Sequence, residues 1–92
     1  MPRIIKLEPA DDKKHKWIAT FEDGRRTRFG AYGASDYTIH KDLARRDRYR
    51  ARHKKDLETN DPYRAGYLSY YILWNKPTIT ESVKDYNRLF DK

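Results

Sequence analysis

The sequence predicts a small α+β fold, in which an N-terminal three-stranded antiparallel sheet precedes about three helices. Three observations predict it. Residues 15–29 alternate apolar and polar side chains around Asp23-Gly24, the pattern of a β-hairpin. Residues 38–55 lack Gly and Pro and are rich in Arg, Lys and Ala, which favours helix. Residues 79–90 have apolar side chains at helical spacing. The 92-residue length predicts a single domain, 1–92.

The β-rich region covers residues 1–30. A β-prone run at residues 4–7 is closed by Pro9, and residues 15–22 alternate, with Trp17, Ala19 and Phe21 on one face. Because an isolated hairpin is only marginally stable, we expect the first run to join it as a third strand.

The hairpin turn is expected at Asp23-Gly24, as a two-residue type I′ turn with both residues at positive φ. The return strand, residues 25–29, then directs Thr27 and Phe29 to the apolar side and Arg26 and Arg28 to the outer face. Residues 30–36 follow as a glycine-containing connector, whose spacing fits neither a Walker A loop nor a dinucleotide-binding loop.

The net charge of +7 is concentrated in residues 41–55, which hold eight Lys/Arg against two Asp/Glu. These residues lie in the predicted basic helix, 38–55, which Ser35, Asp36 or Thr38 can cap. Its apolar stripe is thin, with Ile39 and Leu43 one turn apart. We therefore expect this helix to dock by its first turns and to expose its basic C-terminal half, with a linker at 56–60.

Two further helices are predicted. Residues 62–75 are rich in Tyr and Trp and follow Asp61-Pro62, a cap with proline at the first helical position. A strand is an open alternative there, because aromatic residues also favour strands and Gly66 weakens a helix. Residues 79–90 form an amphipathic helix that begins with the capping box from Thr78 to Glu81.

Composition narrows the function classes. No apolar run approaches the about 20 residues needed to span a bilayer, and no signal peptide is visible. The absence of Cys removes disulfides, a thiolate nucleophile and Cys-based zinc sites. The three His lack the i,i+4 spacing of a helical metal site. Ser35, Asp36 and His40 could act as nucleophile, orienter and base, but capping explains the first two. The sequence thus predicts no enzyme, no metal and no cofactor, although a catalytic site assembled from distant positions stays open.

Two sets of residues are candidates for binding. Basic helices bind polyanions, although they can also be solvated faces that bind nothing. The polyanion-binding candidates are Arg45, Arg46, Arg48, Arg50, Arg52, Lys54 and Lys55, together with Arg26 and Arg28. Eight Tyr and two Trp exceed what a small core needs, so some should be exposed to a partner, although core packing or base stacking would also use them. The candidates for an aromatic interface are Tyr49, Tyr63, Tyr67 and Tyr70.

Residues 29–84 carry a resemblance to a known family. The matching residues are Phe29-Gly30, Gly33, Ser35 to Asp42, Arg46, Arg48-Tyr49, Arg52-His53, Ala65-Gly66, Leu73 to Thr78 and Ser82. In these the chain resembles an uncharacterised family of small basic proteins encoded by nucleocytoplasmic large DNA viruses. The N-terminal hairpin lies outside the resemblance. What the resemblance implies is a viral source, with no established catalytic role.

Together these observations favour a non-enzymatic virion component, a minor capsid or cement-type protein. It would bind acidic surfaces of capsid or other virion proteins through the basic helix and exposed tyrosines. The alternative is a DNA- or RNA-binding protein that contacts phosphates through the same helix. The expected location is the virion or the host cytoplasm or nucleus. An open Arg-rich face with buried Tyr would favour nucleic acid, whereas protruding Tyr63, Tyr67 and Tyr70 with paired Arg would favour a protein scaffold.

Overall fold

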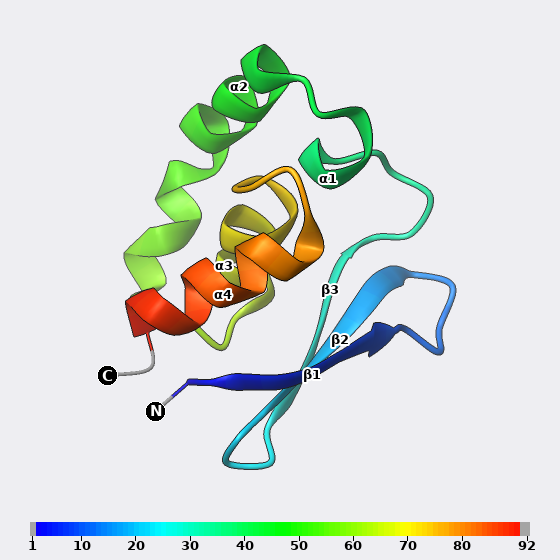
Figure 1. Ribbon diagram of the computed structural model, residues 1–92, viewed down its shortest axis with the longest axis vertical. Coiled ribbons are helices and arrows are strands. Elements are labelled where there is room, and N and C mark those ends of the chain that lie inside the picture. Colours follow the sequence, from blue (N-terminus) through cyan, green and yellow to red (C-terminus); the bar gives the residue numbers. More distant parts are fainter. Residues whose placement is uncertain (1, 91–92) are drawn as a thin grey trace.

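The computed structural model describes residues 2–90 and has the predicted α+β architecture (Figure 1). Strands β1 (Ile4–Pro9), β2 (His15–Phe21) and β3 (Arg26–Ala31) form one antiparallel sheet in the order β1-β2-β3. The helical part contains α1 (Tyr37–His40), α2 (Leu43–His53), the 3₁₀ helix η1 (Lys54–Thr59), α3 (Ala65–Leu68), the π-helix η2 (Ser69–Leu73) and α4 (Ile79–Phe90).

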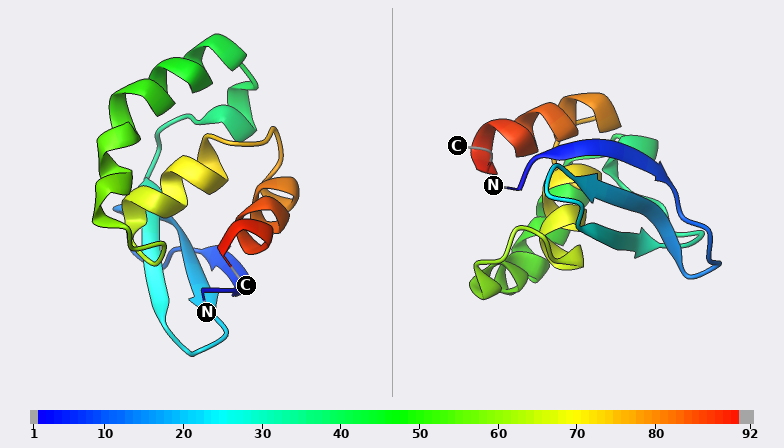
Figure 2. Two further views of the ribbon diagram at one scale, coloured as in Figure 1. Left: turned by 90° about the vertical axis from the view of Figure 1, so that its left-hand side faces the viewer. Right: turned by 90° about the horizontal axis from the view of Figure 1, so that it is seen from below.

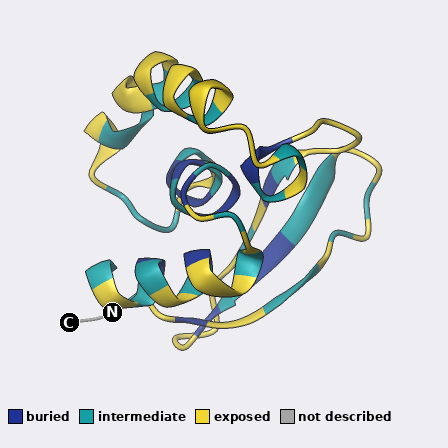
Figure 3. Cartoon of the chain, turned by 45° about the horizontal axis from the view of Figure 1, so that its top comes forward, coloured by how far each residue is buried: buried dark blue, intermediate teal, exposed yellow. Residues whose placement is uncertain are grey.

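The central element is the helical run of α3 and η2. It lies between α4 on one side and α2 with η1 on the other, and the sheet covers a third side (Figures 1 and 2). The buried positions concentrate on this run and on the sheet face that it contacts, whereas most of α2 is exposed (Figure 3). The α2 helix is therefore an outer element of the fold.

The core forms where the inner face of the sheet meets α3, η2 and α4. Ala19, Phe21 and Phe29 contribute the sheet side, as the alternation predicts, and each is fully buried. From α4, the fully buried Tyr86 donates its hydroxyl hydrogen to the carbonyl of Pro62 over 2.7 Å. Burial raises the pKa of this phenol. The polar tip of the core tyrosine is thus satisfied by a loop carbonyl, as burial of a hydroxyl requires.

The hairpin turn differs from the predicted type I′ form. The amide of Gly24 donates to the carbonyl of Phe21 over 2.9 Å, and of the loop residues 22–24 only Gly24 has a positive φ, of 92°. This geometry is a three-residue loop in which Gly24 alone takes the left-handed position. Asp23 instead accepts a hydrogen bond from the amide of Arg25, which a side chain in this turn can do without a positive φ.

The outer edge of β1 is bound by α4 at Ile4. The Asn87 side chain accepts a hydrogen bond from the Ile4 amide (2.9 Å) and donates one to the Ile4 carbonyl (3.1 Å). Its amide group therefore pairs with β1 much as a neighbouring strand would. The register of β1 shifts between Ile4 and Lys6, where the exposed Ile5 stands out of the ladder.

The predicted helix 38–55 is two helices. The chain leaves α1 at Lys41, whose φ is 56°, and starts again at α2. Asp36 caps the start of α1 by accepting from the Thr38 amide. The break follows from Asp42, which caps a new helix start by accepting from the amides of Ala44 and Arg45. The predicted linker at 56–60 is also wrong, since η1 continues the helical path to Thr59.

The predicted docking of this segment is wrong as well. Ile39 and Leu43 are 63% and 53% exposed, and the described residues of α2 include no buried one. The stripe was too short to bury, and α2 contacts the rest of the molecule through polar and aromatic side chains described below.

The aromatic segment predicted at 62–75 is helical, so the strand alternative is wrong, but the helix begins only at Ala65. Asp61 does not cap it; the Asp61 carboxylate accepts from the Tyr63 amide in a local turn. The C-terminal half is a π-helix, closed by the Trp74 amide donating to the Ser69 carbonyl over 3.1 Å.

The predicted amphipathic helix 79–90 is confirmed as α4. The Thr78 hydroxyl accepts from the Glu81 amide (3.2 Å) as the capping box predicts. The Glu81 carboxylate accepts from the Thr78 hydroxyl rather than from a backbone amide.

Candidate polyanion-binding surface

One face of α2 holds this helix on the molecule. Arg46, Tyr49, Arg50 and His53 recur at i, i+3, i+4 and i+7, so they share one side. The guanidinium of Arg50 donates to the carbonyls of Trp74 (2.9 Å) and Tyr70 (3.4 Å) at the end of η2. Arg46 donates to the Asn75 carbonyl over 3.2 Å. These arginines satisfy carbonyls that a helix end leaves without partners, which is favourable at the negative pole of a helix.

Ring stacking completes this inner face. The Tyr49 ring lies 4.2 Å from the Trp74 ring at an interplanar angle of 6°, and the His53 ring stacks on the other side of Tyr49 at 4.1 Å. The Arg50 guanidinium covers the Tyr70 ring at 4.1 Å. Burial raises the pKa of the Tyr49 phenol. Three predicted site residues, Arg46, Tyr49 and Arg50, are therefore engaged in contacts within the molecule.

The opposite face of α2 and the start of η1 carry cations that have no acidic partner among residues 2–90. We call this set the basic row: Arg45, Arg48, Arg52, Lys54 and Lys55. Three of its members follow each other at i, i+3 and i+7, so they share the solvent side of the helix. All five side chains are exposed, and none has an ion pair or hydrogen bond to any residue from 2 to 90. Figure 3 shows this exposed side of the helix.

The acids next to the basic row are already engaged. Asp42 caps α2, and Asp47 pairs with Arg46 of the inner face at 2.8 Å. At the far end, Asp56 contacts the His53 ring at 3.1 Å. The arginines of the row, Arg45, Arg48 and Arg52, are thus left without an ion pair among residues 2–90.

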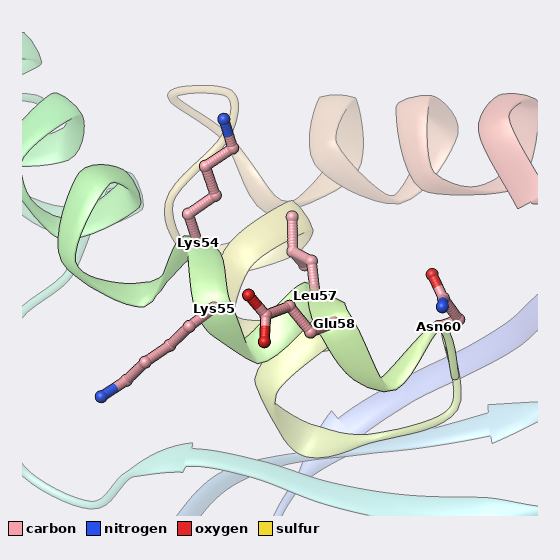
Figure 4. A pocket seen from close by; sticks show the side chains of 5 residues that line it. All are labelled: Lys54, Lys55, Leu57, Glu58 and Asn60. Atoms are coloured by element: carbon pink, nitrogen blue, oxygen red, sulfur yellow. The ribbon is translucent and has the colours of Figure 1, made fainter.

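The end of the row opens into a shallow hollow lined by Lys54, Lys55, Leu57, Glu58 and Asn60 (Figure 4). The two lysine side chains point in different directions, and the Glu58 carboxylate lies to one side of both (Figure 4). The hollow therefore does not gather its cations around one point, and these lysines extend the row rather than form a pocket.

The outer face of the sheet, where Arg26 and Arg28 were expected to join the basic surface, is neutralised. Arg26 pairs with Glu8 at 3.1 Å and Arg28 with Asp11 at 2.9 Å. The hydrogen bond from Arg28 lowers the pKa of Asp11, and the hydrogen bond that Asp12 accepts from the His15 ring lowers the pKa of Asp12 to about 2. The Ile18 side chain is on the same outer face, because Ile18 pairs with Glu8 of β1 and with Arg28 of β3. It is only 2% exposed.

The predicted aromatic interface is mostly internal. Tyr67 and Tyr70 are 7% and 8% exposed, and the Tyr67 hydroxyl donates to the Leu57 carbonyl. Tyr63 is half-buried: its hydroxyl donates a hydrogen bond to the Asp23 carboxylate, and the Arg25 guanidinium covers its ring. The expectation of exposed tyrosines is wrong for Tyr67 and Tyr70, because the central helix is enclosed on three sides and needs large side chains all round.

The trio Ser35, Asp36 and His40 is not assembled as a catalytic unit. The buried Asp36 carboxylate contacts the Lys16 ammonium at 2.5 Å and caps α1. His40 Nδ1 accepts a hydrogen bond from the Asp42 amide over 2.9 Å. Within residues 2–90 no three His, Asp or Glu side chains are placed to hold a metal ion.

The fold and surface define a small α+β domain with an outer cationic helix. The chain belongs to a family of unknown function, DUF5754, whose match covers residues 5–53, more than half of the chain. The expected resemblance at 29–84 is therefore corrected in extent, since the match includes the hairpin and ends with α2. No curated protein and no solved structure matches the chain. No helix of the part that the structure describes has the length and hydropathy to cross a bilayer.

Proposed function

We propose that the protein binds nucleic acid, and that the basic row contacts its phosphates. The observation that carries the proposal is the contrast on α2: its inner arginines are bonded to carbonyls and rings, while Arg45, Arg48 and Arg52 have no partner among residues 2–90. Exposed charges of one sign repel each other, which a polyanion relieves.

The geometry of the row suits a phosphate backbone. Arg45 to Arg52 spans roughly 10 Å along the helix axis, with a cation at each turn. Arginine forks also bind phosphate oxygens in pairs. Three to four such contacts, taken as an order of magnitude, predict a slope of log affinity against log salt of about −3.

Burial of the tyrosines adds support for nucleic acid over a protein scaffold. Tyr67 and Tyr70 are not available to fill pockets in a neighbouring subunit. The basic row would serve either partner, so a role as a minor capsid or cement-type component stays a prediction that rests on charge alone.

The test is a salt titration of binding to an oligonucleotide duplex and to its separate strand. The wild type should bind both, with a steep salt slope. Arg48→Ala/Arg52→Ala should reduce the magnitude of the slope by about 2 on duplex, because two phosphate contacts are lost. Arg26→Ala/Arg28→Ala is the matched control, since it removes the same charge from arginines that pair with Glu8 and Asp11. A flat salt response of the wild type would refute the proposal.

The proposal extends to origin and place. The resemblance to proteins of large DNA viruses supports a viral source, and with it a location in the virion or in the host cytoplasm or nucleus. The partners would then be viral DNA or RNA, or acidic virion proteins. Fractionation of infected material, followed by mass spectrometry, tests whether the protein travels with genome, shells or neither.

A further inference from the structure

Tyr32 differs from the other tyrosines of the chain. It is 62% exposed, and its ring and hydroxyl have no partner within residues 2–90, whereas each of the other seven has a ring contact, a covering guanidinium or a hydroxyl hydrogen bond. Large apolar side chains exposed without a partner mark binding sites when they cluster. Tyr32 does lie in such a cluster.

The cluster surrounds a groove of about 410 Å³ between the end of the sheet and α1. Pro9, Trp17, Tyr32 and Ile39 supply its apolar walls, and Ile39 is itself 63% exposed. The buried pair of Lys16 and Asp36 also lines it and is neutral as a unit. The groove therefore offers flat apolar surface without a free charge on its walls.

The backbone holds Tyr32 at the rim. Its amide donates to the Lys14 carbonyl over 3.1 Å, which joins the segment after β3 to the turn between β1 and β2. The next residue, Gly33, has a φ of 81°. The ring is thus presented by a tight turn instead of a long mobile loop.

Free positive charge stands beside this rim. Lys13 and Lys14 are exposed and have no ion pair within the described residues, while the neighbouring acids are engaged: Asp11 with Arg28, and Asp12 with Arg28 and His15. On the other side, Ile39 leads within a few residues to α2 and the first cation of the basic row, Arg45. An anionic chain can therefore approach the groove from either side.

We propose that this groove takes an unpaired nucleobase of a single-stranded nucleic acid, stacked on Tyr32, with the adjoining phosphate at Lys13 and Lys14. This inference rests on the proposed function and adds to it a preference for single strands. An aromatic ring next to lysines is the combination that holds single strands without sequence preference. Bases inside a duplex have both faces covered by their neighbours, so they offer no face to Tyr32.

The experiment measures binding of an oligothymidylate and of a mixed-sequence duplex of equal length to the wild type, Tyr32→Ala and Tyr32→Phe. Tyr32→Ala should weaken binding to the single strand by roughly 5- to 100-fold, the range for the loss of one base stack, and should leave duplex binding within about twofold. Tyr32→Phe should keep the single-strand affinity, because the ring remains. Ile5→Ala, which trims another exposed apolar side chain at the opposite end of β1, is the matched control and should change neither.

A second readout locates the base directly. A single strand carrying 5-iodouridine, irradiated with the wild type, should cross-link to the peptide that holds Tyr32 or to that of Trp17. Equal binding of both nucleic acids with no effect of Tyr32→Ala would overturn the inference and leave the proposed function standing. Failure to bind either would remove both. Loss of a wild-type dimer in Tyr32→Ala, seen by light scattering, would assign the groove to a second copy and also overturn it.

Discussion

The outer face of the sheet and the outer face of α2 are both rich in arginine, yet only the second is free to bind a polyanion. On the sheet, Arg26 and Arg28 lie across neighbouring strands from Glu8 and from the acids of the β1–β2 turn, and they pair with them. On α2, the two nearest acids are used for a cap and for an inner-face pair. Whether a charge is available thus depends on what the fold places opposite it and not on local composition.

The largest expected effect comes from reversing charge on the two faces. Arg48→Glu/Arg52→Glu should weaken nucleic-acid binding about 100-fold near 0.1 M salt, since each phosphate contact is worth about a factor of ten there. Arg26→Glu/Arg28→Glu carries the same change in net charge and should cost less than about tenfold. Fluorescence anisotropy with a labelled strand measures both. Equal losses would mean that only net charge matters, and the comparison would fail.

A second prediction separates the two faces of α2 by stability. Arg50→Ala should lower the free energy of unfolding by about 1–3 kcal/mol, because the carbonyls of Tyr70 and Trp74 lose their donor. Arg48→Ala should change it by less than about 0.5 kcal/mol, as for an exposed unpaired side chain. Urea denaturation provides the measurement, and a similar loss in both variants would show that the inner contacts do not hold the helix.

A third prediction concerns the stability of the fold at acidic pH. The pKa of Asp12 is about 2 in the folded protein, below the about 3.9 of an unfolded chain. This carboxylate therefore stabilises the fold above about pH 4, and the contribution disappears as pH falls from about 4 to about 2. Asp12→Asn should flatten the fall of the urea midpoint over this range. Glu58→Gln, an exposed acid on η1, serves as the control. If the urea midpoint of Asp12→Asn fell between pH 4 and pH 2 as steeply as that of the wild type, the low pKa of Asp12 would be contradicted.

The smallest effect is expected at Leu43, in the apolar stripe that was predicted to dock the basic helix and is exposed in the structure. Leu43 is 53% exposed, so Leu43→Gln should change the free energy of unfolding by less than about 0.5 kcal/mol. Leu68→Ala, at a fully buried position, should instead cost about 2–5 kcal/mol. Thermal unfolding of the two variants provides the comparison; a large loss at Leu43 would place this side chain in the core.

Much of the fold follows from local sequence. The alternation around residues 17–29 predicts which face of the hairpin meets the core, with Ala19, Phe21 and Phe29 fully buried there, although Ile18 is buried on the outer face as well. The capping box at Thr78 predicts the start of α4 to the residue, because the side chain and the amide that it binds are three positions apart. In both cases the decisive interaction is short-range in the chain.

The rest does not follow from residue type and spacing alone. The break at Lys41 arises because Asp42 caps a second helix, although uninterrupted helix formers surround it. The docking of α2 through Arg50 requires carbonyls some twenty residues further along, which no local pattern reveals. Composition also predicted surplus tyrosines at the surface. Most of them instead pack inside the molecule, because the central helix is enclosed on three sides.

The candidate surface was predictable in part. Charge counting finds the basic helix, but it cannot tell Arg48 from Arg50, because the difference lies in what faces each side. Tyr32 was missed. The available signal was its position between two glycines in a polar connector, where no helix or strand could carry its ring into the core.

The bond pair between Asn87 and Ile4 joins positions 83 residues apart. A ribosome delivers the first strand long before the residue that closes its edge. Until α4 emerges, the nascent sheet lacks both the Asn87 side chain that binds Ile4 and the core residue Tyr86, so this fold can be completed only after α4 has been synthesised. Because α2 precedes α4 in the chain, the residues of the cationic helix are synthesised before the contacts that complete the fold can form.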